Sequence, residues 1–189
     1  MDAVLDNKEI EIKLQIEEED YHRLSSLLKN TEVFEGEKIQ IDSYYSPAGT
    51  SFYDRGDRCL RVRAEDNTAF LSYKRIHEQN SQRQFIEELE TQVDSPEMID
   101  KILKALGYRI EITVNKYRLN YRTRSGFLIA LDSVKNLGFF IEVENANESD
   151  SVQKRNLDLE RYVCGLGLNM ARRNTEGYSN MLYKQLGEE

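Results

Sequence analysis

The 189-residue sequence predicts an α+β fold, with an antiparallel sheet of about eight strands that closes into a β-barrel and helices packed outside it. Two observations predict this fold. Polar and apolar residues alternate in strand-length runs along most of the chain, and short turns join successive runs, which favours antiparallel pairing. The polar faces of these runs are also consistently charged. Since no proline-rich linker divides the chain, we expect one domain over residues 1–189.

The first strand and the first helix follow from two different periodicities. Residues 9–16, EIEIKLQI, alternate polar and apolar positions as a half-buried strand does. Residues 17–30 then change to helical spacing. The expected apolar stripe of this helix consists of Tyr21, Leu24, Leu27 and Leu28.

The rest of the chain predicts further strands and three more helices. One helix begins at Ser95-Pro96, because serine is a good N-cap and proline suits the first turn, and it ends before Gly107. Two other helices are expected at residues 149–166 and 176–186. The remaining strands are expected at residues 38–45, 60–64, 68–75, 83–93, 111–123, 126–133 and 139–145.

Charged side chains occupy one face of most of these strands, opposite apolar residues. A single charged pair of this kind is more often a solvated face than a site. If the sheet closes with these faces inward, however, the charges share an interior in which they must be paired or ligated. A polyanion bound together with a divalent cation would satisfy both signs of charge. The residues concerned are Glu9, Glu11, Lys13, Arg61, Arg63, Lys74, Glu88, Glu90, Lys116, Arg118, Asp132, Glu142 and Glu144.

The residue types on these faces suit a phosphate substrate and a hard cation. Glu9 and Glu11, two positions apart on one strand, can reach one ion such as Mg²⁺, and Glu142 is a third candidate ligand. Arginine supplies bidentate forks to phosphate oxygens, and lysine supplies a point charge. Phosphoryl transfer depends mainly on positioning and charge stabilisation, which such a set of residues can provide.

Other functions and locations are disfavoured. The formal net charge of −8 and the lack of a basic stripe argue against nucleic acid as a partner. No apolar stretch approaches the roughly 20 residues that span a membrane, and the N-terminus has no signal-peptide pattern. Cys59 and Cys164 are isolated, as reduced thiols of a cytoplasmic protein would be. No P-loop, dinucleotide-binding or G-x-S-x-G motif occurs, and the distant His22 and His77 argue against a zinc site.

The motifs of the chain resemble, in order, those of the CYTH superfamily, the triphosphate tunnel metalloenzymes. EIEIK at 9–13 matches the ExExK signature of that family. The segments that follow in the same order are QIDSYY at 40–45, LRVR at 60–63, YK at 73–74, ELE at 88–90, ILKALGY at 102–108, KYR at 116–118, LDSVKNLGFFIEVE at 131–144 and YSNML at 178–182. The resemblance covers nearly the whole chain and is strongest toward proteins assigned as class IV adenylate cyclases.

The resemblance implies a closed eight-stranded antiparallel tunnel that binds a triphosphate with Mg²⁺ or Mn²⁺. Family members often form dimers, so a homodimer is a further expectation. The metal ligands implied are Glu9, Glu11 and Glu142, with Glu144 as an additional acidic candidate. The implied substrate-binding residues are Lys13, Arg61, Arg63, Lys74, Lys116 and Arg118. The candidates for a catalytic role are Lys13, Lys74, Glu88, Glu90 and Asp132.

One departure from the family pattern concerns the nucleotide. Class IV cyclases resemble one another in a His-Phe pair just before the signature strand, where this chain has Ala3 and Val4. Three functions therefore stay open. The preferred one is an adenylate cyclase that converts ATP to cyclic AMP and pyrophosphate. The others are a triphosphatase acting on inorganic, thiamine or nucleoside triphosphate, and a triphosphate-binding module without catalysis.

Overall fold

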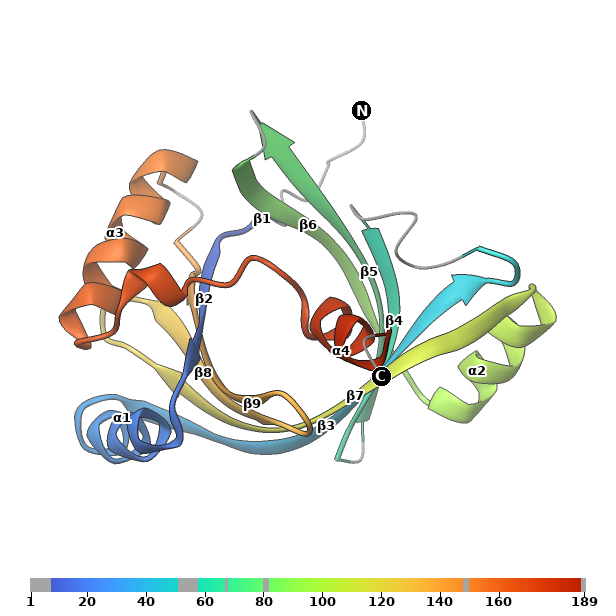
Figure 1. The fold of residues 1–189 in the computed structure, drawn as a ribbon, viewed down its shortest axis with the longest axis horizontal. Helices are drawn as coiled ribbons and strands as arrows, with labels where there is room; N and C mark the ends of the chain where they lie inside the picture. Colours follow the sequence, from blue (N-terminus) through green and yellow to red (C-terminus); the bar gives the residue numbers. More distant parts are fainter. Residues whose placement is uncertain (1–7, 51–57, 67, 80–81, 148–149, 188–189) are drawn as a thin grey trace. The chain divides into compact units, whose positions relative to one another are not determined.

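The computed structural model describes residues 8–50, 58–66, 68–79, 82–147 and 150–187, with the side chains of residues 8, 9, 76, 78, 79 and 82–86 outside that description. Within it, nine strands form one sheet in the order β1-β6-β5-β4-β3-β7-β8-β9-β2 (Figure 1). The strands are β1 (Lys8–Glu9), β2 (Glu11–Ile16), β3 (Val33–Pro47), β4 (Arg58–Glu65), β5 (Thr68–Gln79), β6 (Gln82–Val93), β7 (Tyr108–Arg122), β8 (Phe127–Val134) and β9 (Gly138–Asn145). The helices are α1 (Glu18–Thr31), α2 (Pro96–Ala105), α3 (Val152–Gly165) and α4 (Tyr178–Gly187), with a short 3-10 helix, η2 (Met170–Arg172).

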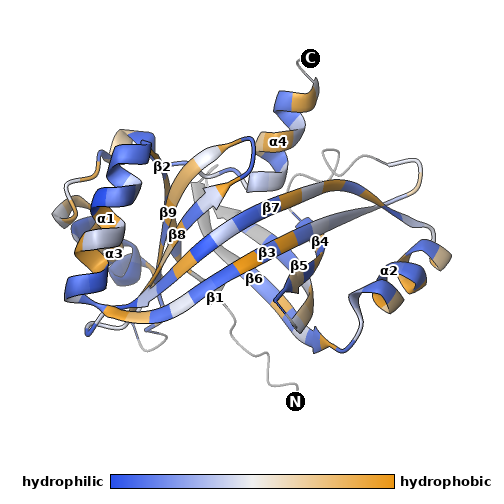
Figure 2. Ribbon diagram, turned by 90° about the horizontal axis from the view of Figure 1, so that it is seen from below, coloured by the Kyte–Doolittle hydropathy of each residue, from blue (hydrophilic) through white to orange (hydrophobic). Residues whose placement is uncertain are grey.

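The chain divides into two compact units, which we describe separately. The first unit contains β1 and residues Asp42–Thr113, and therefore β4, β5, β6 and α2. The second unit contains Ile10–Ile41 and Val114–Glu189, and therefore β2, β8, β9 and the other helices. The long strands β3 and β7 contribute residues to both units, and polar and apolar residues alternate along them (Figure 2).

The apolar core of the second unit lies between its strands and the helices α1 and α3. Ile12 and Leu14 of β2 and Ile141 and Val143 of β9 are at most 1% exposed. Both helices lie against β9, and α3 also lies against β2 (Figure 1). Burying each such side chain contributes about 1.5–3 kcal/mol to folding. The helix side chains that are fully buried here are Leu24, Leu28, Leu159 and Val163.

The core of the first unit lies between β4 and α2. Val62 of β4 is buried with Tyr45 of β3 and Leu103 of α2. Ser95 caps α2 by accepting a hydrogen bond from the backbone N–H of Met98 at 3.1 Å, as its position before a proline predicted. Leu103 and Ile99 are thus the side chains through which α2 packs on this core.

The predicted elements are largely confirmed, with differences at their edges. The first strand is interrupted at Ile10, so the sheet has nine strands where about eight were expected. Strand β3 begins at Val33, five residues before its predicted start at residue 38. Leu27 was wrongly assigned to the buried stripe of α1, since it is 39% exposed. The predicted antiparallel sheet with surrounding helices is present, whereas closure into a barrel is not confirmed.

Membrane insertion through helices was also disfavoured by the sequence. Among the residues that the structure describes, no helix has the length and apolar composition needed to cross a bilayer.

Candidate active site

The strand register of the second unit brings charged side chains together on the face of the sheet opposite the apolar core. Lys13 of β2 is paired with Glu142 of β9. Glu11 and Glu144 form the pair two residues further along the same two strands. Because side chains two residues apart lie on the same face of a strand, all four side chains share one face. We call this face, with the residues of β7 and β8 that adjoin it, the second charged face.

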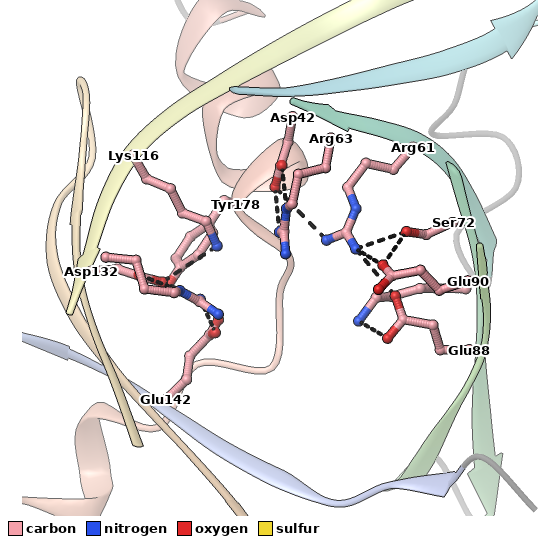
Figure 3. A network of polar contacts seen from close by, with 12 residues as sticks. Asp42, Arg61, Arg63, Ser72, Glu88, Glu90, Lys116, Asp132, Glu142 and Tyr178 are labelled. Carbon is pink, nitrogen blue, oxygen red and sulfur yellow. Dashed lines mark hydrogen bonds and ion pairs between the residues drawn. The ribbon is translucent and has the colours of Figure 1, made fainter. Parts of the chain in front are cut away.

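Asp132 of β8 is the centre of the second charged face (Figure 3). Its side chain is fully buried, and Arg118 of β7 donates two hydrogen bonds to it, from Nε to Oδ1 at 2.7 Å and from Nη2 to Oδ2 at 2.5 Å. The Lys116 ammonium lies 3.6 Å from the same carboxylate, and the Tyr178 hydroxyl donates to Oδ2 at 2.9 Å. A buried carboxylate is tolerated when it is paired and hydrogen-bonded in this way.

Glu142 adds a second negative charge to the same group of cations. Its carboxylate accepts a hydrogen bond of 2.5 Å from Arg118 Nη2. Burial alone would raise the pKa of Glu142, but Arg118, Lys116 and Lys13 together hold that pKa well below its usual value of 4.5. Burial likewise opposes the charge of Arg118, yet Asp132 and Glu142 raise the pKa of its guanidinium well above its usual value. Glu142 and Arg118 are therefore ionised at neutral pH.

The pair of Glu11 and Glu144 fits a divalent cation by its chemistry. Two carboxylates directly opposite each other on neighbouring strands repel, and a bound cation removes that repulsion. Carboxylate oxygens are also the ligands that Mg²⁺ and Mn²⁺ prefer. Among the described side chains, no three of the types His, Cys, Asp and Glu form a ready metal-binding group. The side chain of Glu9, another predicted ligand, lies outside the described residues.

The first unit carries a comparable group of charges on β4, β5 and β6, which we call the first charged face. Arg61 is paired with Ser72, which is paired with Glu90 on the next strand. Arg61 Nη2 donates to Ser72 at 3.0 Å, to Glu88 at 3.1 Å and to Glu90 at 3.2 Å (Figure 3). Lys74 lies 3.0 Å from Glu88. Five polar groups of three strands thus form one connected network.

Asp42 of β3 completes the first charged face. Its carboxylate is 1% exposed and accepts two hydrogen bonds of 2.7 Å from Arg63, at Nε and Nη2, while Arg61 lies 3.8 Å away. Burial would lower the pKa of Arg61, but Asp42, Tyr44 and Glu88 raise it above its usual value. Arg61 Nε is buried without a hydrogen-bond partner among the described residues. That N–H is therefore an unsatisfied buried donor within the described part of the chain.

The structure groups the predicted residues by unit. The first charged face contains Arg61, Arg63, Lys74, Glu88 and Glu90, and the second contains Glu11, Lys13, Lys116, Arg118, Asp132, Glu142 and Glu144. Sequence reasoning missed Asp42, Ser72 and Tyr178. Gln40 and Asp42 are two residues apart in β3, so alternation places them on the same face of that strand. Both are buried in the structure, so this spacing was a signal that could have identified Asp42. Tyr178 belongs to no strand, so alternation could not identify it, although the segment YSNML at 178–182 had been noted for its family resemblance.

Comparisons with known proteins agree on one family and one fold. The family model of the CYTH domain matches residues 7–157. "Putative adenylate cyclase MJ0240" of Methanocaldococcus jannaschii is 28% identical over 157 residues, which are 79% of this chain and 87% of that protein. A solved structure from Pyrococcus horikoshii OT3 is 27% identical, with a TM-score of 0.79 over 93% of this chain and 99% of that one. A "putative adenylyl cyclase" from Hippeastrum, described with a dominant triphosphatase activity, shares the fold at 18% identity, with a TM-score of 0.68 over 95% of each chain.

Proposed function

Because the chain belongs to the CYTH domain family, we propose that it is a metal-dependent enzyme that acts on a triphosphate. The observation that carries this proposal is the concentration of buried or half-buried cations on two strand faces, where Lys13, Arg61 and Lys116 are each at most 6% exposed. Buried cations of this kind are rare unless a ligand or a partner needs them. As the specific reaction we propose the conversion of ATP to cyclic AMP and pyrophosphate.

The cations would bind the phosphate oxygens. Arg63 and Arg118 each use Nε and Nη2 to hold an aspartate, which fixes the plane of the guanidinium. A guanidinium fixed in advance loses little side-chain entropy when its remaining N–H groups meet a phosphate. Arg61 offers its buried Nε, and Lys13, Lys74 and Lys116 add point charges. These six residues are the substrate-binding set of this proposal.

Glu11, Glu142 and Glu144 of the second charged face would hold Mg²⁺ or Mn²⁺, with Glu9 as a further ligand. When bound, the ion would neutralise charge on the phosphates and make the attacked phosphorus more electrophilic. The protein's own part is to hold these carboxylates ionised. The low pKa of Glu142 supports this part, since its carboxylate keeps its charge at neutral pH.

We also propose that the sheet closes into the tunnel that the family resemblance implies. Its support is topological. The ends of the strand order are β1 and β2, and only Ile10 separates these strands in the chain. A chain segment that pairs with β6 through one end and with β9 through the other is the arrangement that closure of one sheet requires.

Two reactions use the same charges on different phosphorus atoms. In the cyclase reaction the ribose 3′-hydroxyl attacks the α-phosphorus, its proton is removed, and pyrophosphate leaves. In the triphosphatase reaction water attacks the terminal phosphorus and orthophosphate leaves. The name of the M. jannaschii relative supports the first reaction. The residues Ala3 and Val4, where cyclases have a His-Phe pair, favour the second reaction as the alternative, although both lie outside the described part of the structure.

A product assay tests the proposal. Purified protein with Mg²⁺ or Mn²⁺ is given ATP, inorganic triphosphate and thiamine triphosphate in separate reactions. Cyclic AMP with an equal amount of pyrophosphate identifies the cyclase, and orthophosphate from any of the three identifies the triphosphatase. Saturable metal-dependent binding without turnover would reduce the protein to a binding module. If none of the three triphosphates is either turned over or bound, the proposal is overturned.

A further inference from the structure

Tyr178 lies beyond residue 157, where the family match ends, yet it contacts the centre of the second charged face. It is the first residue of α4, and its side chain is 5% exposed. The Lys13 ammonium lies 4.6 Å from the centroid of its ring, and the Lys116 ammonium lies 5.3 Å from it. Its hydroxyl donates to Asp132 (Figure 3). The ring of Phe140 packs against it at a centroid distance of 4.9 Å.

The chain that precedes Tyr178 is attached to the strand that carries Lys13. After α3 the segment runs beside β2 toward α4 (Figure 1). Arg173 forms an antiparallel bridge with Leu14, and the backbone N–H of Asn174 donates to the carbonyl oxygen of Lys13 at 2.8 Å. The position of Tyr178 is therefore tied through the backbone to the residue whose ammonium its ring contacts.

An aromatic ring and a carboxylate act differently on a neighbouring cation. A carboxylate neutralises an ammonium, whereas a ring attracts it through its quadrupole and leaves the net charge unchanged. One ring therefore attracts the ammonium groups of both Lys13 and Lys116 and neutralises neither. A tyrosine that only filled the core would need the contact with Phe140 and none of the charged contacts.

We propose that Tyr178 is a positioning residue of the triphosphate site. Its ring holds the ammonium groups of Lys13 and Lys116 where phosphate oxygens bind, while its hydroxyl adds one hydrogen bond to an Asp132 carboxylate that Arg118 already holds. This inference rests on the proposed function. It assigns a role to a residue of the C-terminal segment, which follows the matched residues 7–157.

Two substitutions separate the ring from the hydroxyl. Tyr178→Leu removes both, and we expect about tenfold weaker binding of inorganic triphosphate in calorimetry with Mg²⁺, the loss of one desolvated cation–π contact. Tyr178→Phe keeps the ring, so its affinity should stay within about twofold of the wild type. The matched control is Tyr162→Leu, because Tyr162 of α3 packs on Phe127 at the same centroid distance of 4.9 Å, with no lysine of the described residues over its ring. This control should bind as the wild type does.

A second measurement needs no substrate. A tyrosine ring shifts nearby protons upfield, so the ε-methylene signals of Lys13 and Lys116 should be displaced in the wild type and in Tyr178→Phe. In Tyr178→Leu they should return to ordinary positions. Ordinary positions in the wild type would overturn the inference, even if Tyr178→Leu failed to fold. Equal triphosphate affinity in the wild type and a folded Tyr178→Leu variant would also overturn it. Displaced signals without any triphosphate binding would instead overturn the proposed function and leave the lysine placement supported.

Discussion

Replacement of Asp132 by asparagine tests whether the buried charges of the second unit form one interdependent group. The substitution keeps the shape and one acceptor oxygen but removes the charge that Arg118, Lys116 and Tyr178 share. Removing one partner of a buried ion pair costs about 3–5 kcal/mol, because it leaves the other charge uncompensated. Since Glu142 still accepts from Arg118, we expect the lower end, a loss of about 3 kcal/mol.

Urea unfolding followed by circular dichroism measures this loss. With a slope of about 2 kcal/mol per molar urea, the midpoint should fall by about 1.5 M. The matched control is Asp158→Asn on the outer surface of α3, where the carboxylate pairs with Lys154 and Arg161 and is 29% exposed. Exposed pairs contribute little, so its midpoint should hardly move. Equal shifts in the two variants would refute the reasoning that burial makes Asp132 important.

Three other predictions concern pH, phosphate and metal. The pKa of Glu142 is lowered in the folded state, so the stability that its ionised carboxylate contributes is complete above pH 4.5 and is lost as the pH falls from there through the folded pKa. The difference in unfolding free energy between the wild type and Glu142→Gln should therefore shrink below pH 4.5. A difference that stays constant with pH would contradict this prediction. Arg63→Lys removes the bidentate contact with Asp42 and should weaken inorganic triphosphate binding about tenfold in calorimetry, so an unchanged affinity would exclude Arg63 from the clamp. Glu11→Gln should weaken Mn²⁺ binding at least about tenfold in a titration without substrate, while its circular dichroism spectrum stays that of the wild type; unchanged Mn²⁺ affinity would remove Glu11 from the ligand set.

The sequence predicted which face of a strand a residue occupies better than which residue of the neighbouring strand it is paired with. Alternation placed Lys116 and Arg118 on one face of β7, and the structure agrees. It could not reveal that Arg118 is paired with Asp132, because alternation has a period of two and leaves the register between strands open. The family resemblance assigned these residues to one site but did not predict which of them contact each other. The role of Asp42 depended on such a register, so it was missed although its segment had been noted.

In helices, the spacing of apolar residues predicted more buried positions than the structure has. The spacing of α1 correctly identified Tyr21, Leu24 and Leu28 as buried, but Leu27 fits the same apolar stripe and is exposed. The apolar stripe that spacing predicts is broader than the line along which a helix contacts its sheet. Spacing alone therefore cannot tell whether a residue at the edge of the stripe is buried. Neither alternation nor helical spacing predicted the contacts of Tyr178, although its segment had been noted, because they depend on how the chain after α3 returns to β2. Such returns are set by tertiary packing, which periodicity does not encode.

The two charged faces use the same construction, and this similarity supports a common role. In each unit an arginine holds a buried aspartate of a neighbouring strand through Nε and Nη2, as Arg63 does with Asp42 and Arg118 with Asp132. In each unit the second cation comes from two residues earlier on the arginine's own strand, Arg61 at 3.8 Å and Lys116 at 3.6 Å from the aspartate. A pairing that served stability alone could be replaced by apolar residues of similar volume at little cost. A guanidinium fixed in this way in each unit instead suits the phosphate contacts that we propose for these residues.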